Sequence, residues 1–346
     1  MTFPTCLPVS RVPDPAAAPP LGWGIAGPGW IAERFAQALT AHTRQRLVAV
    51  GSRSRARAAA FAERWDIPRA YDDLAQMSAD PGVDIVYVAT PHNHHLPVAL
   101  AAIEAGKHVL VEKPLALNVA EAERLRDTAR QHGVLLVEAL WTAFLPKFDV
   151  IRQLLDDGAL GQVHTVIADH GEHFGPDHRI MRPDLAGGPM LDLGTYAVAL
   201  SQMVLGEPED VRSVGAPASS GVNGQVGMTF RHAGSALSLL HCTLLGHTTC
   251  QAILSGTDGM LTMPRKFYEP GPFVLQANDL ATSLVHDEAA SGYAGLCHEI
   301  AHVAECVAEG RLESPVLPLA QTIATLRSMD RVREQLGIVF DEERSA

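Results

Sequence analysis

The stretch "WGIAGPGWIAERFA", residues 23–36, runs from an apolar segment through a glycine turn into a helical pattern. Its Gly27-x-Gly29-x-x-Ala32 spacing is typical of the turn that holds a dinucleotide pyrophosphate at a helix N-terminus. Gly27 permits the tight turn, Gly29 lets backbone amides approach the phosphates, and Ala32 lets the helix pack close to the strand. We expect the cofactor to contact Gly27, Gly29, Trp30 and Ile31.

The surroundings of this turn support a dinucleotide site. Short apolar runs alternate with helical patterns, and the expected strands are residues 23–26, 47–52, 83–90, 108–112 and 134–139. Near-continuous apolar strands that alternate with helices indicate a parallel sheet covered on both faces. We therefore predict an α/β chain whose N-terminal Rossmann domain spans residues 21–142, preceded by a flexible, proline-rich tail at 1–20.

The pattern changes after residue 143. A helical segment at 148–157 is followed by strand-like runs at 163–170, 211–217, 225–231, 236–245 and 250–255, and by helical segments at 294–309 and 318–336. Alternating hydrophobicity with turns at this spacing favours an antiparallel or mixed sheet. Residues 143–346 are thus predicted to form a second α/β domain with a mostly antiparallel sheet.

Composition excludes several classes of partner. The 346 residues are 47% hydrophobic and carry a formal charge of −12, which argues against nucleic acid and against anionic membranes. No apolar run approaches the ~18 residues that span a bilayer. The five cysteines are odd in number and form no CxxC pair, which indicates free thiols in a reducing, cytoplasmic compartment.

The end of the second expected strand bears on cofactor choice. An NAD enzyme usually places an acid about 20 residues past the glycines, to bond the ribose 2′-hydroxyl. Here "VGSRSRAR" offers Ser52, Arg53 and Arg57, with no acid before Glu63. Guanidinium groups suit a 2′-phosphate, which an acid would repel. We predict NADP rather than NAD; a solvated, basic helix start is the alternative.

"LVEKPLALN", residues 110–118, places Glu112 and Lys113 where the fifth strand ends. In an open parallel sheet, ligands bind beyond the carboxyl ends of the strands. A lysine there reaches the nicotinamide ribose and the reacting oxygen, and Pro114 restricts the turn that aims it. The alternative is a strand that simply ends in solvent.

These motifs together resemble the Gfo/Idh/MocA oxidoreductases. "EKPLALN" combines with "ATPHNHH" one strand earlier and "GGPMLDLGTY" downstream. Within that family, "VEALWTAFLP" and "ECVAEGRLESPVLPL" are most similar to the dimeric dihydrodiol dehydrogenases and the NADP-dependent D-xylose dehydrogenases. The resemblance implies that the second domain binds substrate and that its open sheet serves as a face for a homodimer or a higher oligomer.

The resemblance also implies roles for individual residues. Lys113 matches the lysine that contacts cofactor and substrate, and Tyr196 matches the position of a catalytic histidine or tyrosine. Asp192 would orient the substrate hydroxyl or Lys113, while Tyr196 would act as the general base. If 190–200 is helical, Asp192 and Tyr196 share one face. Further cofactor contacts are expected from Thr90, His95 and Glu112.

The chain departs from the subgroup at Ala143, where its members often carry an arginine. Any substrate contact from that arginine is absent, which bears on the use of dihydrodiols. Trp141 and Phe144 are expected to wall the substrate pocket, with core packing as the alternative. The expected reaction transfers hydride between the nicotinamide and a CH–OH/C=O group of a sugar or cyclic polyol, the alternative being a trans-dihydrodiol.

A different class is suggested by "HEIAH", residues 298–302, which matches the H-E-x-x-H zinc-hydrolase pattern. No third histidine follows at metzincin spacing, and "ESPVLPL" interrupts the helix where a glutamate ligand would lie. We therefore expect no metal and read the motif as helix surface. A catalytically silent NADP-binding regulator is the remaining alternative.

Overall fold

The computed structural model describes residues 3–289 and 291–344. It divides into two compact units. The first unit comprises Pro13–Phe144 and Gly292–Ile323; the second comprises the chain up to Val12, Leu145–Ser291 and the chain from Ala324. The segment Gly292–Ile323 was assigned by sequence to the second domain, and it groups instead with the first.

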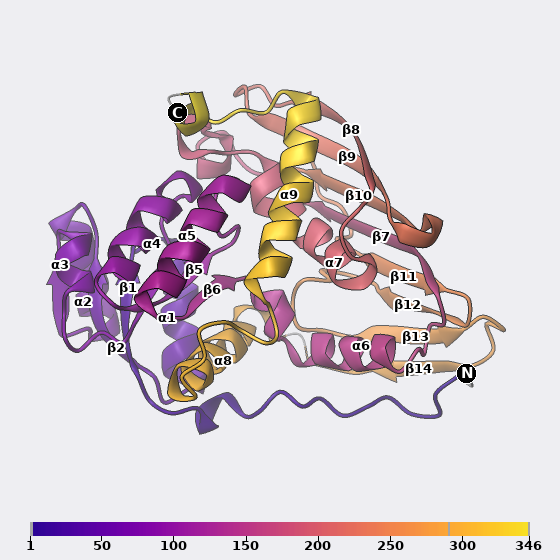
Figure 1. Ribbon diagram of the computed structural model, residues 1–346, viewed down its shortest axis with the longest axis horizontal. Helices are drawn as coiled ribbons and strands as arrows, with labels where there is room; N and C mark the ends of the chain where they lie inside the picture. Colours follow the sequence, from indigo (N-terminus) through magenta and orange to yellow (C-terminus); the bar gives the residue numbers. More distant parts are fainter. Residues whose placement is uncertain (1–2, 290, 345–346) are drawn as a thin grey trace. The chain divides into compact units, whose positions relative to one another are not determined.

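The first unit contains a parallel sheet in the order β3-β2-β1-β4-β5-β6 (Figure 1). Its strands are β1 Gly22–Ala26, β2 Arg46–Gly51, β3 Arg69–Tyr71, β4 Ile85–Val88, β5 His108–Glu112 and β6 Leu136–Ala139. All residues of β1, β4 and β6 are buried, as expected for strands covered on both faces. The predicted Rossmann sheet is confirmed, and its strand order reverses between β1 and β4, where such folds bind ligands.

Helices of the first unit begin and end at recognisable signals. They are α1 Trp30–His42, α2 Arg55–Trp65, α3 Leu74–Ser78, α4 His95–Glu104, α5 Val119–His132 and α8 Leu296–Ala308. Asn118 caps α5 by accepting from Glu121 N at 3.0 Å, and Gly133 ends it with φ 65°. Sequence analysis missed β3 and α3, because three and five residues are too few for a periodic pattern.

Helix α8 explains the changed boundary between the units. It packs against α1 and against the short 3₁₀ helix η1 Pro15–Ala17. Ala18, Ala301 and Ala304 form a small core there, covered by Leu21. Apolar burial thus attaches both a C-terminal helix and the proline-rich segment to the first unit. The remaining 3₁₀ helices of this unit are η2 His92–His94, η3 Trp141–Phe144 and η8 Gly292–Gly295.

The described part of the N-terminal segment, which sequence predicts as a flexible tail at 1–20, makes hydrogen bonds to a helix. Within the second unit, the Arg11 guanidinium donates to Asp149 Oδ1 at 2.7 Å, and Arg11 N donates to Asp149 Oδ2 at 2.6 Å. These bonds hold the segment against helix α6 Pro146–Asp156. The segment is rich in proline, and charge-assisted hydrogen bonds of this kind stabilise its position on the helix.

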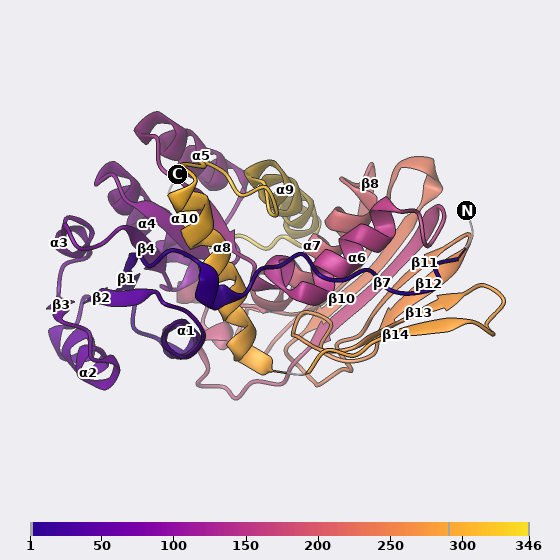
Figure 2. The ribbon, with the colours of Figure 1, turned by 90° about the horizontal axis from the view of Figure 1, so that it is seen from below.

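The second unit is built on an eight-stranded sheet in the order β14-β13-β12-β11-β7-β10-β9-β8 (Figure 2). Its strands are β7 Val163–Gly171, β8 Asp210–Pro217, β9 Asn223–Arg231, β10 Leu237–Thr243, β11 Ala252–Gly256, β12 Gly259–Met263, β13 Phe273–Ala277 and β14 Ser283–His286. Among the described strands of this sheet, β7 and β10 alone pair in parallel, which confirms a mostly antiparallel sheet. Strands β12 to β14 were not predicted.

The two faces of this sheet differ in burial. One cross-strand row is entirely buried: Val211, Phe230, Ser238, Val166, Leu254, Leu261 and Leu275. The row one residue further along lies on the opposite face: Thr229, Leu239, Ile167, Ile253, Thr262, Val274 and Val285. Leu239 is 44% exposed and Val285 is 61% exposed, so the second face is open as predicted.

The second unit also contains several helical elements besides α6. Helix α7 is Thr195–Leu205, preceded by the π-helical turn η6 Met190–Gly194; helix α9 Leu319–Leu336 begins in the first unit and continues into the second; helix α10 is Asp341–Arg344. Three 3₁₀ helices are η4 Arg179–Met181, η5 Pro183–Leu185 and η7 Ala233–Ser235. Buried Ser201 of α7 bonds Ser238 of the buried sheet row at 2.7 Å, which satisfies both hydroxyls.

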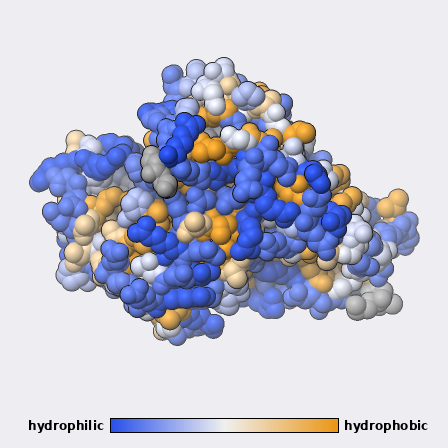
Figure 3. All heavy atoms as spheres, turned by 45° about the horizontal axis from the view of Figure 1, so that its top comes forward, coloured by the Kyte–Doolittle hydropathy of each residue, from blue (hydrophilic) through white to orange (hydrophobic). Residues whose placement is uncertain are grey.

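No helix among the described residues is long and apolar enough to cross a membrane. On the face drawn in Figure 3, hydrophobic residues form small patches within a mostly hydrophilic surface.

Candidate active site

The glycine turn of the first unit has the geometry of a phosphate-binding loop. Gly27 has φ +96°, a conformation that L side chains rarely adopt, and a Cβ there would lie 3.0 Å from Ala89 O. A Cβ on Gly29 would meet nothing within 4 Å, so the turn faces open space. Gly29 is also the N-cap of α1 and makes no side-chain cap bond, which leaves the first helix amides without a side-chain acceptor.

The basic residues after β2 lie beside this turn. The Arg57 guanidinium donates to Pro28 O at 3.0 Å, so a basic group reaches back to the glycine loop. Arg53 is exposed, while Ser52 is buried and its hydroxyl accepts from Ser54 N at 3.2 Å. Arg53 and Arg57 therefore stand at the strand end where a ribose would lie, and Ser52 also stabilises the local turn.

Two neighbouring strand ends carry the other predicted cofactor contacts. Thr90 follows β4, and its buried Oγ1 has no hydrogen-bond partner among the described residues. His95 is fully buried between the backbone carbonyls of Pro114 at 2.9 Å and Thr90 at 3.0 Å. His95 thus ties the loop after β4 to the loop after β5, and a direct contact with the cofactor stays a prediction.

Glu112 and Lys113 end β5 in different environments. Glu112 is 9% exposed and accepts a short hydrogen bond from the Tyr87 hydroxyl, whereas Lys113 is only partly buried. The turn that follows is held by buried Glu138, which accepts from Leu115 N at 3.0 Å and from the Thr322 hydroxyl at 2.9 Å. Burial raises the pKa of Glu138. A contact of Glu112 with the cofactor stays a prediction, and Lys113 is the more accessible residue of the motif.

Aromatic rings of the first unit form a continuous array. The Tyr293 ring stacks on Trp141 with centroids 5.5 Å apart and meets Trp30 edge-on at 5.0 Å. Trp30 is 58% exposed, while Trp141 and Phe144 are 3% and 2% exposed. Within this unit Trp141 and Phe144 pack as core residues, so their substrate contact stays a prediction. Sequence analysis missed Tyr293 because it lies 263 residues from Trp30 in the chain, in the segment that was predicted to belong to the second domain.

The "HEIAH" segment forms part of α8. Glu299 is 0% exposed, so the expectation of a surface position is wrong for this residue. Its two carboxylate oxygens have no hydrogen-bond partner among the described residues, and burial raises the pKa of Glu299 well above its usual range. His302 bonds the Ser314 hydroxyl at 2.8 Å. In the part of the chain that the structure describes, no three potential metal ligands converge.

These observations fit a dinucleotide in the first unit. The uncapped start of α1 suits a pyrophosphate, and the open space at Gly29 leaves room for it. The buried Thr90 hydroxyl lacks a partner at the next strand end, where a bound molecule could supply one.

In the second unit, Asp192 and Tyr196 stand on one continuous helical segment. Asp192 belongs to the π-helical turn and Tyr196 to the first turn of α7, so simple α-helical spacing does not relate them. Asp192 forms a two-point ion pair with Arg179, with both N–O distances at 3.0 Å. Sequence analysis missed Arg179, whose loop carries no motif. The predicted orienting acid is therefore itself oriented by a guanidinium.

Tyr196 belongs to a cluster of three rings. Its centroid lies 5.4 Å from that of His170 and 4.9 Å from that of Tyr268, and His170 and Tyr268 stack at 4.1 Å. Glu172 Oε1 accepts from the Tyr268 hydroxyl at 2.8 Å and bonds His170 Nε2 at 2.9 Å. The bond from His170 lowers the pKa of Glu172 to about 2, and burial raises that of Tyr268. Only Tyr196 of this cluster was predicted.

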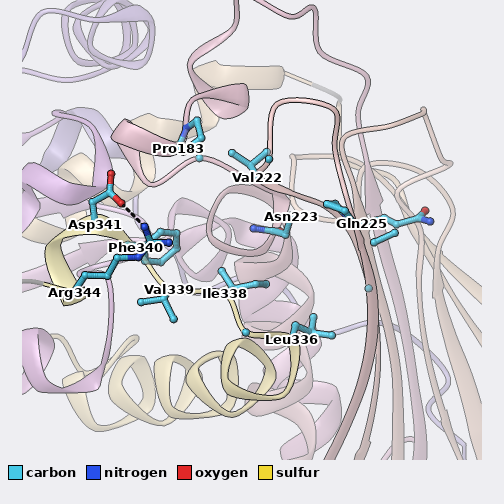
Figure 4. Close-up of a pocket in the computed structure, with 16 residues that line it drawn as sticks. Pro183, Val222, Asn223, Gln225, Leu336, Ile338, Val339, Phe340, Asp341 and Arg344 are labelled. Atoms are coloured by element: carbon cyan, nitrogen blue, oxygen red, sulfur yellow. Dashed lines mark ion pairs between the residues drawn. The ribbon is translucent and has the colours of Figure 1, made fainter.

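The second unit also contains a pocket of about 380 Å³ next to its C-terminal segment (Figure 4). Asn223, Phe340 and the ion pair of Asp341 with Arg344, at 3.2 Å, line it. None of the predicted catalytic or binding residues lines this pocket. We therefore take the ring cluster at Tyr196, and not this pocket, as the candidate substrate site of the second unit.

Comparison with known proteins agrees with both units. The model of the oxidoreductase family with an NAD-binding Rossmann fold matches residues 21–140, and that of the GFO/IDH/MocA C-terminal domain matches residues 148–262. The chain belongs to the Gfo/Idh/MocA oxidoreductase family. The predicted family and fold class are confirmed, and the protein is an oxidoreductase with an NAD(P)-binding domain.

Among similar members, a trans-1,2-dihydrobenzene-1,2-diol dehydrogenase of Xenopus tropicalis is 32% identical over 92% of this chain and 98% of its own. An aldose-aldose oxidoreductase from Caulobacter crescentus, solved with glycerol, is 26% identical with a TM-score of 0.80, over 92% of this chain and 98% of that one. KijD10, a 3-ketoreductase from Actinomadura kijaniata solved with NADP and TDP-benzene, is 27% identical with a TM-score of 0.80, over 91% and 98%.

Proposed function

We propose that the protein is an NADP-dependent oxidoreductase that interconverts a hydroxyl and a carbonyl group on a sugar or cyclic polyol. The observation that carries the proposal is the ring cluster, because the Tyr196 ring packs on His170 and Tyr268, which both bond the carboxylate of Glu172. Hydroxyl-bearing substrates need such acceptors. The aldose and glycerol in the name of one similar structure support the same substrate class.

Preference for NADP is supported by charge after β2. Arg53 is exposed, Arg57 bonds the glycine loop, and no acid lies between them. A 2′-phosphate gains charge-assisted bonds from guanidinium groups. The NADP in the KijD10 structure supports this choice.

The bound nicotinamide would supply the hydride acceptor for oxidation of an alcohol. In our proposal Tyr196 removes the proton of the substrate hydroxyl while the carbon that bears this hydroxyl loses a hydride, so that a C=O group results. Asp192, held by Arg179, orients the reacting hydroxyl. Lys113 binds the nicotinamide ribose and polarises the reacting oxygen. In the opposite direction Tyr196 returns the proton to the carbonyl oxygen.

A trans-dihydrodiol is the second candidate substrate. The observation in its favour is that relatives 32% identical over nearly the whole chain carry the dihydrodiol dehydrogenase name. Ala143 argues against a trans-dihydrodiol substrate, because subgroup members often have an arginine at this position. Assays with sugars, polyols and trans-dihydrodiols as substrates distinguish the two candidates.

We further propose that the open face of the second sheet forms a homodimer. Four of its residues, which lie in the adjacent strands β11, β7 and β10, form an apolar surface: Leu237, Leu239, Ile167 and Ile253. Leu239→Asp should convert a dimer to a monomer in sedimentation analysis, while Leu312→Asp, in the first unit, should not. The free cysteines support the cytoplasmic location that sequence suggests.

The test is a panel of aldoses, polyols and trans-dihydrodiols, assayed at the reduced-nicotinamide absorbance band with NADP⁺ and with NAD⁺. We expect NADP-linked oxidation of at least one sugar or cyclic polyol. Lys113→Ala should abolish turnover and leave cofactor binding largely intact, whereas Arg130→Ala, an exposed cation on α5, should change neither. Cofactor binding without turnover on the whole panel would favour the silent regulator, and stoichiometric bound zinc would favour the hydrolase.

A further inference from the structure

The second carboxylate oxygen of Glu172 distinguishes it from the other acids near Tyr196. Oε1 is saturated by His170 and Tyr268, but Oε2 has no hydrogen-bond partner among the described residues. The side chain is 36% exposed, so Oε2 is accessible. Asp192, by contrast, has both oxygens engaged by Arg179.

The position of Glu172 is fixed by its surroundings. It directly follows β7, and its backbone N donates to Thr243 O at 3.1 Å. His170 is 1% exposed and Tyr268 is 3% exposed, so the two partners of Oε1 are themselves held by packing. A carboxylate whose partners are locked is preorganised to bind a ligand.

The same two partners place Glu172 next to the reacting group. Both rings that bond its Oε1 also pack on the ring of Tyr196, at 5.4 and 4.9 Å between centroids. A substrate whose hydroxyl reaches the Tyr196 phenol therefore brings its neighbouring hydroxyl towards Glu172.

We propose that Glu172 is a substrate-binding residue whose Oε2 accepts a hydrogen bond from a second substrate hydroxyl, on a carbon near the one that is oxidised. This inference rests on the proposed function and narrows its substrate class. The site takes neutral molecules with at least two hydroxyl groups. It discriminates against monoalcohols, which leave the charged oxygen unsatisfied, and against carboxylated or phosphorylated sugars, which it repels.

The test compares Glu172→Gln with the wild type on the best neutral sugar of the panel and on its monodeoxy analogues. For one analogue, the wild type should lose about 10- to 100-fold in kcat/KM, the value of a hydrogen bond to a charged group. Glu172→Gln should lose a similar factor on the parent sugar and nothing further on that analogue. This non-additivity identifies a direct contact.

Two further variants serve as references. Glu209→Gln, which removes an exposed partner of Arg231 in the same unit, should leave all the ratios unchanged. Tyr268→Phe removes one support of Glu172 and should show the same selective pattern, with a smaller loss. It also tests the inference if Glu172→Gln does not fold. An equal loss on the parent and on every analogue would mean a structural role, and no loss would mean no contact; either result overturns the inference.

Binding without turnover separates this inference from the proposed function. Calorimetry with NADPH present measures association of the same sugars, because an alcohol cannot be oxidised by a reduced cofactor. Binding that Glu172→Gln weakens, without activity in the panel, would support the Glu172 contact and reject the proposed reaction. If the wild type neither binds nor oxidises any neutral polyol, both proposals are rejected.

Discussion

The two units present their functional groups in different ways. In the first unit, the groups follow the carboxyl ends of β2, β4 and β5, and each belongs to a short contiguous motif, such as Glu112–Lys113. In the second unit, the groups around Tyr196 come from three separate segments: the end of β7, helix α7 and the loop after β12. In a parallel sheet the ends of consecutive strands lie at one edge, whereas the groups around Tyr196 come from segments 24 to 98 positions apart in the chain.

One carboxylate from each unit illustrates the contrast. Glu172 in the second unit bonds His170 and Tyr268, which keeps its pKa low. Glu299 in the first unit is more deeply buried and has no such donors among the described residues, and its pKa is raised. Hydrogen-bond donors therefore outweigh burial at Glu172, whereas burial prevails at Glu299, and also at Glu138 despite its two donors.

The largest expected effect tests whether chemistry depends on the ring cluster. Tyr196→Phe keeps the ring contacts but removes the hydroxyl, so we expect kcat to fall about 10³-fold, the scale of general base catalysis. Cofactor affinity, measured by fluorescence titration, should stay the same. Tyr71→Phe, whose hydroxyl bonds Asp80 at 2.8 Å, is the matched control and should keep full activity. Full activity in Tyr196→Phe would remove this residue from the mechanism.

The next effect concerns the first unit alone. Arg53→Asp should lower the ratio of kcat/KM for NADP⁺ to that for NAD⁺ about 10²-fold, because an acid repels the 2′-phosphate and suits a free ribose. The KM for the alcohol should change little. Arg55→Asp reverses a neighbouring exposed charge that pairs with Asp72 at 3.6 Å, and should leave the ratio unchanged. An unaltered ratio in Arg53→Asp would exclude that arginine from cofactor recognition.

Glu299→Gln should stabilise the protein at alkaline pH. Because the folded state raises the pKa of this acid, its ionisation opposes folding, and stability is lost as pH rises above about 4.5. Glu112 is the charged neighbour that adds to the effect. We expect the thermal midpoint to rise by about 2–4 °C at pH 8 and to change less at pH 5. A gain that is the same at both pH values would show that Glu299 does not titrate in this way.

The smallest expected effect is on stability through Glu172, and its pH dependence is opposite to that of Glu299. The folded state lowers the pKa of Glu172 from 4.5 to about 2, so its contribution to stability is present above pH 4.5 and is lost as pH falls towards 2. Glu172→Gln should therefore have a lower thermal midpoint than the wild type at pH 7, and the gap should close in acid. His170, Tyr268, His178, Cys250 and Lys266 are titratable groups that face Glu172. A gap that persists at pH 2–3 would contradict this account.

Sequence reasoning succeeded where local pattern and chemistry coincide. The glycine turn, the strand ends at Ser52–Arg57 and at Glu112–Lys113, and the Asn118 cap are all readable because backbone conformation and ligand chemistry constrain adjacent residues. The alternation of apolar residues also indicated the antiparallel strands of the second sheet, although β12 to β14 were missed, and the open face was expected from the family resemblance.

The amino-acid sequence by itself determined the two α/β architectures, the family and the position of the nucleotide-binding edge, because these follow from periodicity and short motifs. Only the tertiary structure decided that Gly292–Ile323 joins the first unit, that Arg179 holds Asp192, and that His170, Glu172 and Tyr268 surround Tyr196. The reason is physical: packing and hydrogen bonds between distant segments depend on how the chain folds back on itself, and no local pattern encodes that geometry.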